Sequence, residues 1–214
     1  MESQPFGNLA MGMIKPFGPS IVKVKLPADL INQFNNYVDE VLADENRARS
    51  LDHGPHLAGN VMQEFLLEAA FMERIKWREF IGVVCNEWLK RTNGNQLKDL
   101  TIIKSWIVRQ FQNEYNPLHH HGGHISGVAY LKLPPDMGSP VQEGKQRNSN
   151  GNLVFTYGSP NLFAKATFEV EPEVGDFYLF PNYLLHAVYP FTGSDEERRS
   201  VSFNAVLDPE ASVY

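Results

Sequence analysis

The sequence contains a single cysteine, Cys85, among its 214 residues. No intrachain disulfide can therefore form, and a reducing cytoplasm is the expected setting. Long apolar runs are also missing, because charged residues or prolines interrupt every apolar stretch, and we expect no membrane-spanning helix. Residues 1–18 have no basic stretch followed by an apolar one, so we expect no secretory signal.

An excess of basic residues is lacking as well. The chain has 19 Lys and Arg against 25 Asp and Glu, a formal net charge of −6. This balance provides no broad cationic surface for phosphate backbones, so nucleic acid is not expected as the main partner. Hydrophobic residues make up 43% of the chain, which excludes disorder over most of its length. We expect one domain, residues 1–214, that is an enzyme or a small-molecule binding module.

The first 100 residues are predicted to contain a strand and supporting helices. Residues 21–26 alternate between apolar and basic side chains, as in a strand. Apolar residues at helical spacing predict helices from about 27 to 42 and from about 71 to 91. Their apolar faces fit burial either in the core or against a partner. The polar segment 45–60 contains Gly54-Pro55 and is interpreted as a loop.

The second half of the chain favours strands, because the helical period disappears after residue 100. The predicted strands span residues 101–112, 126–133, 152–157, 164–171, 175–180, 184–188 and 198–207. Many short strands without intervening helices are typical of a two-sheet sandwich or barrel. We expect residues 101–207 to form this core, with the N-terminal helices packed on one face. Residues 134–151 are polar and rich in Pro and Gly, and predict a loop.

Four of the seven histidines lie between residues 119 and 124. In extended backbone, His119 and His121 point to one face and His120 to the other. Two imidazoles on one face can chelate a first-row metal ion, and His186 is the best candidate for a third ligand. A chance polar loop is the alternative interpretation of the triplet. Three other histidines fit ordinary surface or core positions: His53, His56 and His124.

A second group of polar residues follows in the last predicted strand. Arg198, Ser200, Ser202 and Asn204 alternate onto one face, and Arg199 lies on the other. An inward arginine with a serine two residues later can grip a carboxylate, because guanidinium binds carboxylates bidentately. The hydroxyl of Tyr130 can contribute to the same contact. The alternative is that both arginines belong to a solvated strand edge.

Together these motifs resemble the Fe(II)- and 2-oxoglutarate-dependent dioxygenase superfamily. The resemblance lies in His-x-His followed by Ser-Gly-Val-x-Tyr-Leu, then Gly-x-Phe-x-Leu-Phe-Pro-x-x-Leu-x-His, then Arg-x-Ser-x-Ser-Phe-Asn, over residues 101–207. More narrowly, the chain is similar to 2-oxoglutarate–Fe(II) oxygenases of marine bacteria and cyanophages, distant relatives of prolyl hydroxylases. The resemblance implies a double-stranded β-helix, a jelly-roll or cupin-like core, in the cytoplasm of a bacterium or a phage-infected host.

The resemblance also implies an iron site. His119 occupies the first ligand position and His186 the distal one. Family members usually carry Asp or Glu two residues after the first histidine, whereas this sequence has His121 there. We expect His121 to complete the triad, with a carboxylate from Glu114 or Asp176 as the alternative.

The cofactor contacts follow from the same resemblance. Arg198 takes the place of the residue that binds the distal carboxylate of 2-oxoglutarate, with Ser200 beside it and Tyr130 as a hydrogen-bonding partner. Arg199 replaces Arg198 if the strand register is shifted by one residue. The implied activity couples decarboxylation of 2-oxoglutarate to succinate with hydroxylation, by molecular oxygen, of an unidentified small molecule or peptide. No catalytic residue beyond the metal ligands is expected.

Two alternative functions stay open at this point. A cupin-like three-histidine metal enzyme that does not use 2-oxoglutarate explains His121 but leaves Arg198 and Ser200 unexplained. If the chain is instead a non-catalytic jelly-roll binding module, none of the histidines has a functional role. If the chain is an oxygenase, the loops at residues 53–60 and 134–151 are candidates for covering its substrate.

Overall fold

The computed structural model describes residues 11–14, 18–162 and 164–207. The first ten residues, which hold most of the segment predicted to lack a secretory signal, lie outside the described residues. Within the described ranges, no helix is long and apolar enough to span a bilayer.

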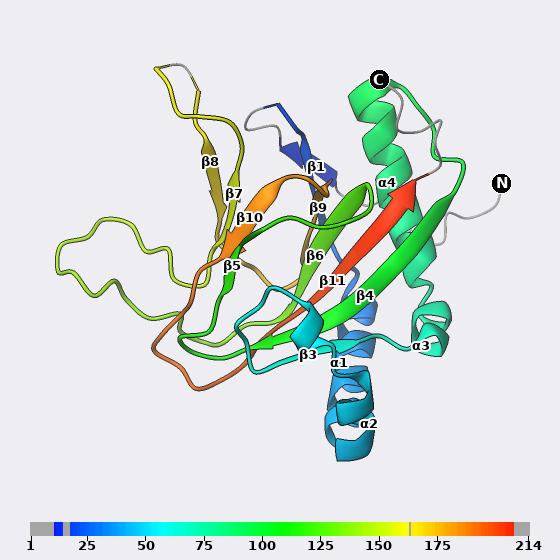
Figure 1. Ribbon diagram of the computed structural model, residues 1–214, viewed down its shortest axis with the longest axis horizontal. Coiled ribbons are helices and arrows are strands. Elements are labelled where there is room, and N and C mark those ends of the chain that lie inside the picture. The colour runs from blue at the N-terminus through cyan, green and yellow to red at the C-terminus, as the bar shows by residue number, and fades with distance from the viewer. Residues whose placement is uncertain (1–10, 15–17, 163, 208–214) are drawn as a thin grey trace.

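Two antiparallel sheets form the body of the molecule (Figure 1). The larger sheet consists, in spatial order, of β1 (Met11–Ile14), β2 (Ile21–Lys25), β9 (Asp176–Pro181), β6 (Ile125–Lys132), β11 (Arg198–Leu207), β4 (Leu100–Gln110) and β3 (Gln63–Leu66). The smaller sheet consists of β5 (Asn116–His119), β10 (Leu185–Val188), β7 (Leu153–Thr156) and β8 (Thr167–Val170). The predicted two-sheet core is confirmed. Three short strands, β1, β3 and β5, were not predicted.

Helices cover one face of the larger sheet, as predicted, and the smaller sheet lies on the other side (Figure 1). The helical elements are α1 (Ala28–Leu42), α2 (Glu45–Leu51), η1 (Gly54–His56), α3 (Ala69–Arg74) and α4 (Trp77–Asn93). The indole of Trp77 is fully buried between the layers, with ring centroids 5.9 Å from Phe177 and 6.1 Å from Phe203. Edge-to-face aromatic contacts of this kind stabilise the helix–sheet interface.

Two predicted boundaries in the N-terminal half were wrong. The segment 45–60 was interpreted as a loop, but it begins with α2, whose first turn is capped by the Asp44 carboxylate accepting from two backbone N–H groups. Only Ala48 of α2 is buried, so the helix has no apolar stripe that a periodicity argument could detect. The predicted helix 71–91 is two helices, because Lys76 adopts a left-handed conformation (φ 55°) between α3 and α4.

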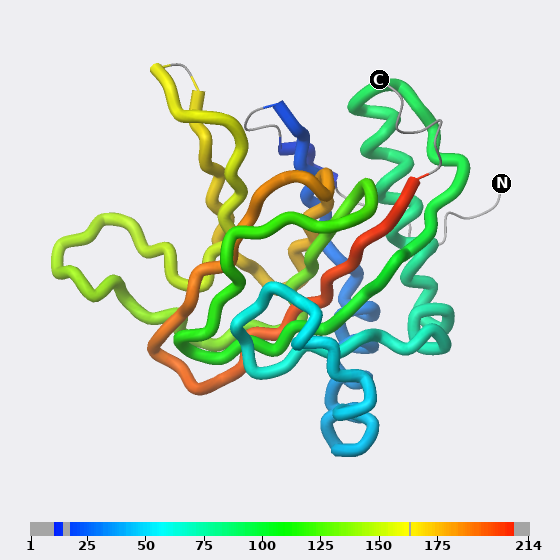
Figure 2. Tube along the Cα trace, in the orientation of Figure 1, coloured from blue at the N-terminus to red at the C-terminus, as the bar shows by residue number. Residues whose placement is uncertain are grey.

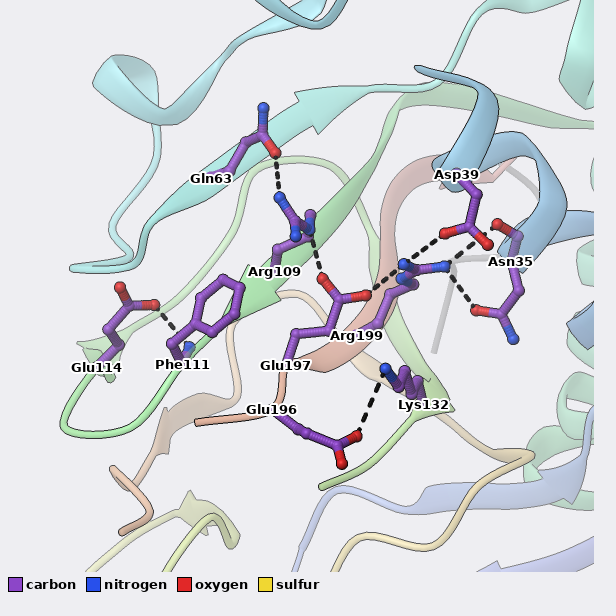
Figure 3. Close-up of polar contacts among 10 residues, drawn as sticks. All are labelled: Asn35, Asp39, Gln63, Arg109, Phe111, Glu114, Lys132, Glu196, Glu197 and Arg199. Atoms are coloured by element: carbon purple, nitrogen blue, oxygen red, sulfur yellow. Dashed lines mark hydrogen bonds and ion pairs between the residues drawn. The ribbon is translucent and has the colours of Figure 1, made fainter. Parts of the chain in front are cut away.

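A buried ionic network joins the helical layer to the two longest strands (Figure 3). Glu197 accepts from Arg109 Nε at 2.5 Å and also pairs with Arg199. Arg199 in turn reaches the Asp39 carboxylate of α1 at 2.8 Å. The side chains of Glu197 and Arg199 are only 7% and 6% exposed. Each buried charge therefore depends on its partners, because an unpaired charge away from water is costly.

Replacing Glu197 with Ala is expected to destabilise the protein by about 3–5 kcal/mol, because it leaves two arginines without their shared buried partner. Urea unfolding measures this free energy. The matched control is Glu196→Ala, since Glu196 is exposed and pairs with Lys132 at 3.6 Å. A loss below about 1 kcal/mol is expected for the control. Equal losses in the two variants would contradict the structural role given to the network.

Candidate metal and cofactor site

Three histidine side chains converge beside strands β5 and β10 of the smaller sheet. His119 of β5 and His186 of β10 are directly opposite each other in the antiparallel ladder. His121 follows β5, and its backbone is held at the β9–β10 turn by two hydrogen bonds with Asn182, of 3.0 Å and 2.9 Å. The ligand atoms of the three histidines lie within 4.8 Å of one another. The predicted trio is thus brought together, with strand pairing placing two members and a turn the third.

Backbone carbonyls orient two of the rings. The Nδ1 atom of His119 lies 2.6 Å from the carbonyl of Pro117, and Nδ1 of His186 lies 2.8 Å from that of Leu184. A carbonyl only accepts, so each Nδ1 carries the proton and each Nε2 presents its lone pair. The Nε2 atoms of His121 and His186 are 3.1 Å apart. Two metal–nitrogen bonds of ~2.1 Å at a right angle also place their nitrogens about 3 Å apart.

Burial keeps the trio neutral. It lowers the pKa of His121 to about 2 and that of His186 to about 3, and the neighbouring histidines add to both effects. The pKa of His119 is lowered by burial as well. A metal ion needs unprotonated imidazole nitrogen, so these groups are ready to coordinate at neutral pH.

A narrow cavity of about 50 Å³ leads from the histidines along the inner face of the larger sheet to Arg198, Ser200 and Tyr130. The Arg198 side chain is buried, and its guanidinium carbon lies 5.0 Å from the ring centroid of Tyr130. Arg198 Nε and the Tyr130 hydroxyl are both buried without a hydrogen-bond partner. Two unsatisfied donors facing one cavity indicate a ligand that accepts hydrogen bonds.

The alternatives left open by the sequence lie elsewhere in the fold. Arg199 points away from the cavity into the network with Asp39. Asp176 is paired with Lys23 and Lys25, at 2.7 Å and 2.6 Å. Glu114 accepts from the backbone N–H of Phe111 at 2.8 Å (Figure 3). Neither carboxylate is part of the histidine group.

Three residues of the cavity wall that carry a polar side-chain group were not predicted: Trp106, Gln110 and Asn116. Gln110 is the most informative, because its Oε1 accepts from Arg198 Nη1 at 2.6 Å. Its Nε2 donates to the backbone carbonyl of Glu114 at 2.6 Å, which determines the orientation of the amide. Alternation along β4 places Trp106, Val108 and Gln110 on one face, but only the strand pairing shows which face lines the cavity.

A second, wider pocket of about 410 Å³ adjoins the first and shares Trp106, Asn116, His119 and His121 with it. Glu64 of β3 belongs to this pocket and was also missed, because β3 itself was not predicted. The remaining histidines differ in role. His56 lines the second pocket, whereas His124 accepts from the backbone N–H of Leu207 at 3.0 Å and has a structural function.

The loop 53–60 contributes His56, Leu57 and Ala58 to the wall of the second pocket. The other proposed cover, residues 134–151, forms no helix or strand and lines neither pocket. Figure 2 shows it as a long yellow-green loop on the opposite side of the molecule from α3 and α4.

Comparison with known families identifies the chemistry. Residues 104–204 match the family described as "Putative 2OG-Fe(II) oxygenase". This segment, 101 of the 214 residues, belongs to the 2OG-Fe(II) oxygenases by sequence. Its cofactors are therefore Fe(II) and 2-oxoglutarate, and its co-substrate is molecular oxygen. No curated protein sequence matches the chain.

Solved structures of low sequence identity share the fold of this oxygenase. AviO1 from Streptomyces viridochromogenes Tue57 is 16% identical, with a TM-score of 0.58 over 90% of this chain and 91% of that one. A prolyl-4-hydroxylase from Pseudomonas putida is 16% identical, with a TM-score of 0.56 over 94% and 92%. HygX from Streptomyces hygroscopicus, with nickel, 2-oxoglutarate and hygromycin B bound, is 12% identical, with a TM-score of 0.54 over 94% and 84%. The predicted double-stranded β-helix is confirmed.

The carboxyl of Glu64 makes stability depend on pH. Burial raises its pKa from 4.5 to about 7, with a smaller contribution from Asp52. A raised acid pKa means that the folded state loses stability as pH rises from the unfolded pKa towards the folded one. Glu64→Gln should therefore gain stability relative to wild type between about pH 5 and about pH 8, by up to about 3 kcal/mol.

Urea unfolding of both metal-free proteins across this range measures the difference, in which the titration of the histidines cancels. Glu79→Gln, on the exposed side of α4, controls for the loss of one carboxylate. A wild-type-minus-Gln difference that does not change with pH would show that Glu64 is not held in a desolvated position.

Proposed function

We propose that the oxygenase holds Fe(II) with His119, His121 and His186, and binds the distal carboxylate of 2-oxoglutarate with Arg198, Ser200 and Tyr130. The single observation that carries this assignment is Arg198, a buried guanidinium with no acidic partner among the described residues, in the wall of the same cavity as the three histidines.

Charge balance supports the assignment. Among the described residues, no Asp or Glu lines the narrow cavity, and Arg198 is its one charged side chain. Three neutral imidazoles add no negative charge, so a divalent cation beside Arg198 leaves an excess of positive charge. A dicarboxylate such as 2-oxoglutarate places a carboxylate at the metal and another at Arg198, and so offsets most of this positive charge. Because His121 stands where a carboxylate is usual, the site favours a negatively charged ligand such as 2-oxoglutarate over a neutral one.

When bound, Fe(II) and 2-oxoglutarate supply the activation of molecular oxygen, with 2-oxoglutarate converted to succinate and carbon dioxide as a substrate C–H bond is hydroxylated. The chain's own residues position these partners. Gln110 holds Arg198 in the cavity, and the Pro117 and Leu184 carbonyls hold the imidazole tautomers. Apolar side chains, among them Leu153 and Phe180, keep water away from the cavity wall.

The same observation separates this function from its rivals. A cupin-like enzyme that does not use 2-oxoglutarate has no use for an unpaired arginine in the cavity, and a binding module does not need three neutral, converging imidazoles. We further propose that residues 1–214 form one domain, because β1, β2 and β3 from the first 100 residues share a sheet with later strands. The cytoplasm stays the predicted compartment.

The assignment predicts the outcome of an anaerobic titration with Fe(II) and 2-oxoglutarate, followed by the visible charge-transfer band of the chelated keto acid. Wild type should give a saturable band. His186→Ala should lose it, because one of three ligands is missing. Arg198→Ala should keep metal binding but need at least about tenfold more 2-oxoglutarate, because a charge-assisted contact is removed.

His120→Ala is the matched control, since His120 is exposed and lies between two proposed ligands. Its band should match that of wild type. Thermal melts of all variants verify folding. If wild type binds metal but gives no band, the cupin-like enzyme becomes the favoured function. If wild type binds no metal, the binding module is favoured.

Gln110→Glu provides an independent test of the arginine. One oxygen of the new carboxylate would lie where Oε1 now accepts from Arg198 at 2.6 Å and would pair with the guanidinium. The other oxygen replaces the Nε2 that donates to the Glu114 carbonyl, so a thermal melt verifies that the variant folds. The 2-oxoglutarate concentration at half-saturation of the band should rise at least about tenfold, while metal affinity stays within about twofold. Gln146→Glu in the exposed loop controls for added charge. Unchanged 2-oxoglutarate affinity in Gln110→Glu would show that Arg198 is not the anchor.

A further inference from the structure

The second pocket is placed to receive a substrate. Its walls include His119 and His121 from the proposed iron site, and its volume is about 410 Å³. The narrow cavity, in contrast, leads from the same histidines towards Arg198. A molecule in the second pocket therefore borders His119 and His121 of the proposed iron site, whereas Arg198 lines only the narrow cavity. This volume suits a small molecule rather than a folded partner.

Glu64 is the unsatisfied acceptor in this pocket. The residue is only 2% exposed, and its Oε2 has no hydrogen-bond partner. The loop 53–60 packs closely against the Glu64 carboxyl. A Cβ added at Gly59 of this loop would lie 2.9 Å from Oε2 and 3.0 Å from Oε1. A buried carboxyl oxygen without a donor is costly, and a ligand that donates to it removes that cost.

Lys104 is the cation of the same pocket. Its ammonium lies 5.5 Å from the centroid of the Trp106 ring, and its charge lowers the pKa of Glu64 without forming an ion pair with it among the described residues. Glu64 is opposite Val108 in the β3–β4 ladder, four residues beyond Lys104. The two strand positions are therefore separated by roughly 13 Å along the sheet. Both side chains line one pocket with Trp106 between them, and no ion pair joins them.

We propose that this pocket binds an amino acid in its zwitterionic form, with the ammonium at Glu64 and the carboxylate at Lys104. The inference rests on the proposed function, which makes the histidine trio the place where a C–H bond of this molecule reacts. The ammonium of a zwitterion stabilises the ionised form of Glu64, whose pKa burial raises to about 7, and its carboxylate pairs with Lys104. A simple amine leaves Lys104 unpaired, a simple acid leaves Glu64 unpaired, and a neutral sugar compensates neither charge.

Ligand-observed NMR tests the proposal without turnover. The protein is loaded with redox-inactive Zn(II) and 2-oxoglutarate, and the probes are the twenty L-amino acids, β-alanine, 4-aminobutyrate and 6-aminohexanoate. The last three vary the distance between ammonium and carboxylate. At least one probe should bind saturably. Its N-acetyl and carboxamide derivatives should each bind at least about tenfold more weakly, because each lacks one charge-assisted contact.

Two charge-neutralising variants assign the contacts. Glu64→Gln should weaken the amino acid at least about tenfold and bind the N-acetyl derivative nearly as well as the amino acid. Lys104→Gln should behave in the same way towards the carboxamide. The matched controls are Glu79→Gln and Lys90→Gln on the exposed face of α4, which should bind like wild type. Thermal melts confirm that each variant is folded.

The proposal is overturned if none of the probes binds, or if a probe binds with the same affinity to wild type, Glu64→Gln and Lys104→Gln. The Fe(II) and 2-oxoglutarate titration of wild type separates the two levels of inference. A normal charge-transfer band without amino acid binding rejects the zwitterion pocket alone. Loss of the band in wild type rejects the proposed function on which the pocket depends.

Discussion

The buried guanidinium of Arg198 is the constraint on which the site depends. A charge that lies away from water and has no acid beside it is stable only if something else supplies negative charge. Its neighbour Arg199 has the opposite solution, since it is held by Glu197 and Asp39 on the other face of the strand. Two consecutive arginines on one strand thus serve two layers. One anchors the helices, and the other binds the cofactor in the proposed assignment.

The charge of the metal site follows the same logic. In the proposed metal site, His121 replaces the usual carboxylate ligand. The two carboxylates that could have compensated are engaged elsewhere, Asp176 with two lysines and Glu114 with backbone. A site of three neutral imidazoles relies on its ligand for negative charge. The affinity for metal and the affinity for 2-oxoglutarate are therefore expected to be coupled, since each reduces the electrostatic cost of binding the other.

Much of the fold could be predicted from local sequence patterns. The strands between Leu100 and Leu207 are runs of apolar and β-branched residues without a helical period, and the stripe of α1 is a clear helical pattern. What failed had no period to detect. Helix α2 buries only Ala48, and the four-residue strands β3 and β5 are too short for alternation to be informative. The break at Lys76 is invisible in sequence, because the apolar stripe continues across a residue whose backbone reverses hand.

The sequence by itself determined the residue types of the site and the family: three histidines, an arginine with its serine, and the order in which they occur. Alternation also determined that Arg198 and Arg199 face opposite sides of their strand. Only the tertiary structure decided which side is the cavity, because that depends on where the helices pack. It also brought Glu64, Lys104 and Gln110 to the site, since contacts between residues far apart in sequence depend on strand pairing, which local patterns do not encode.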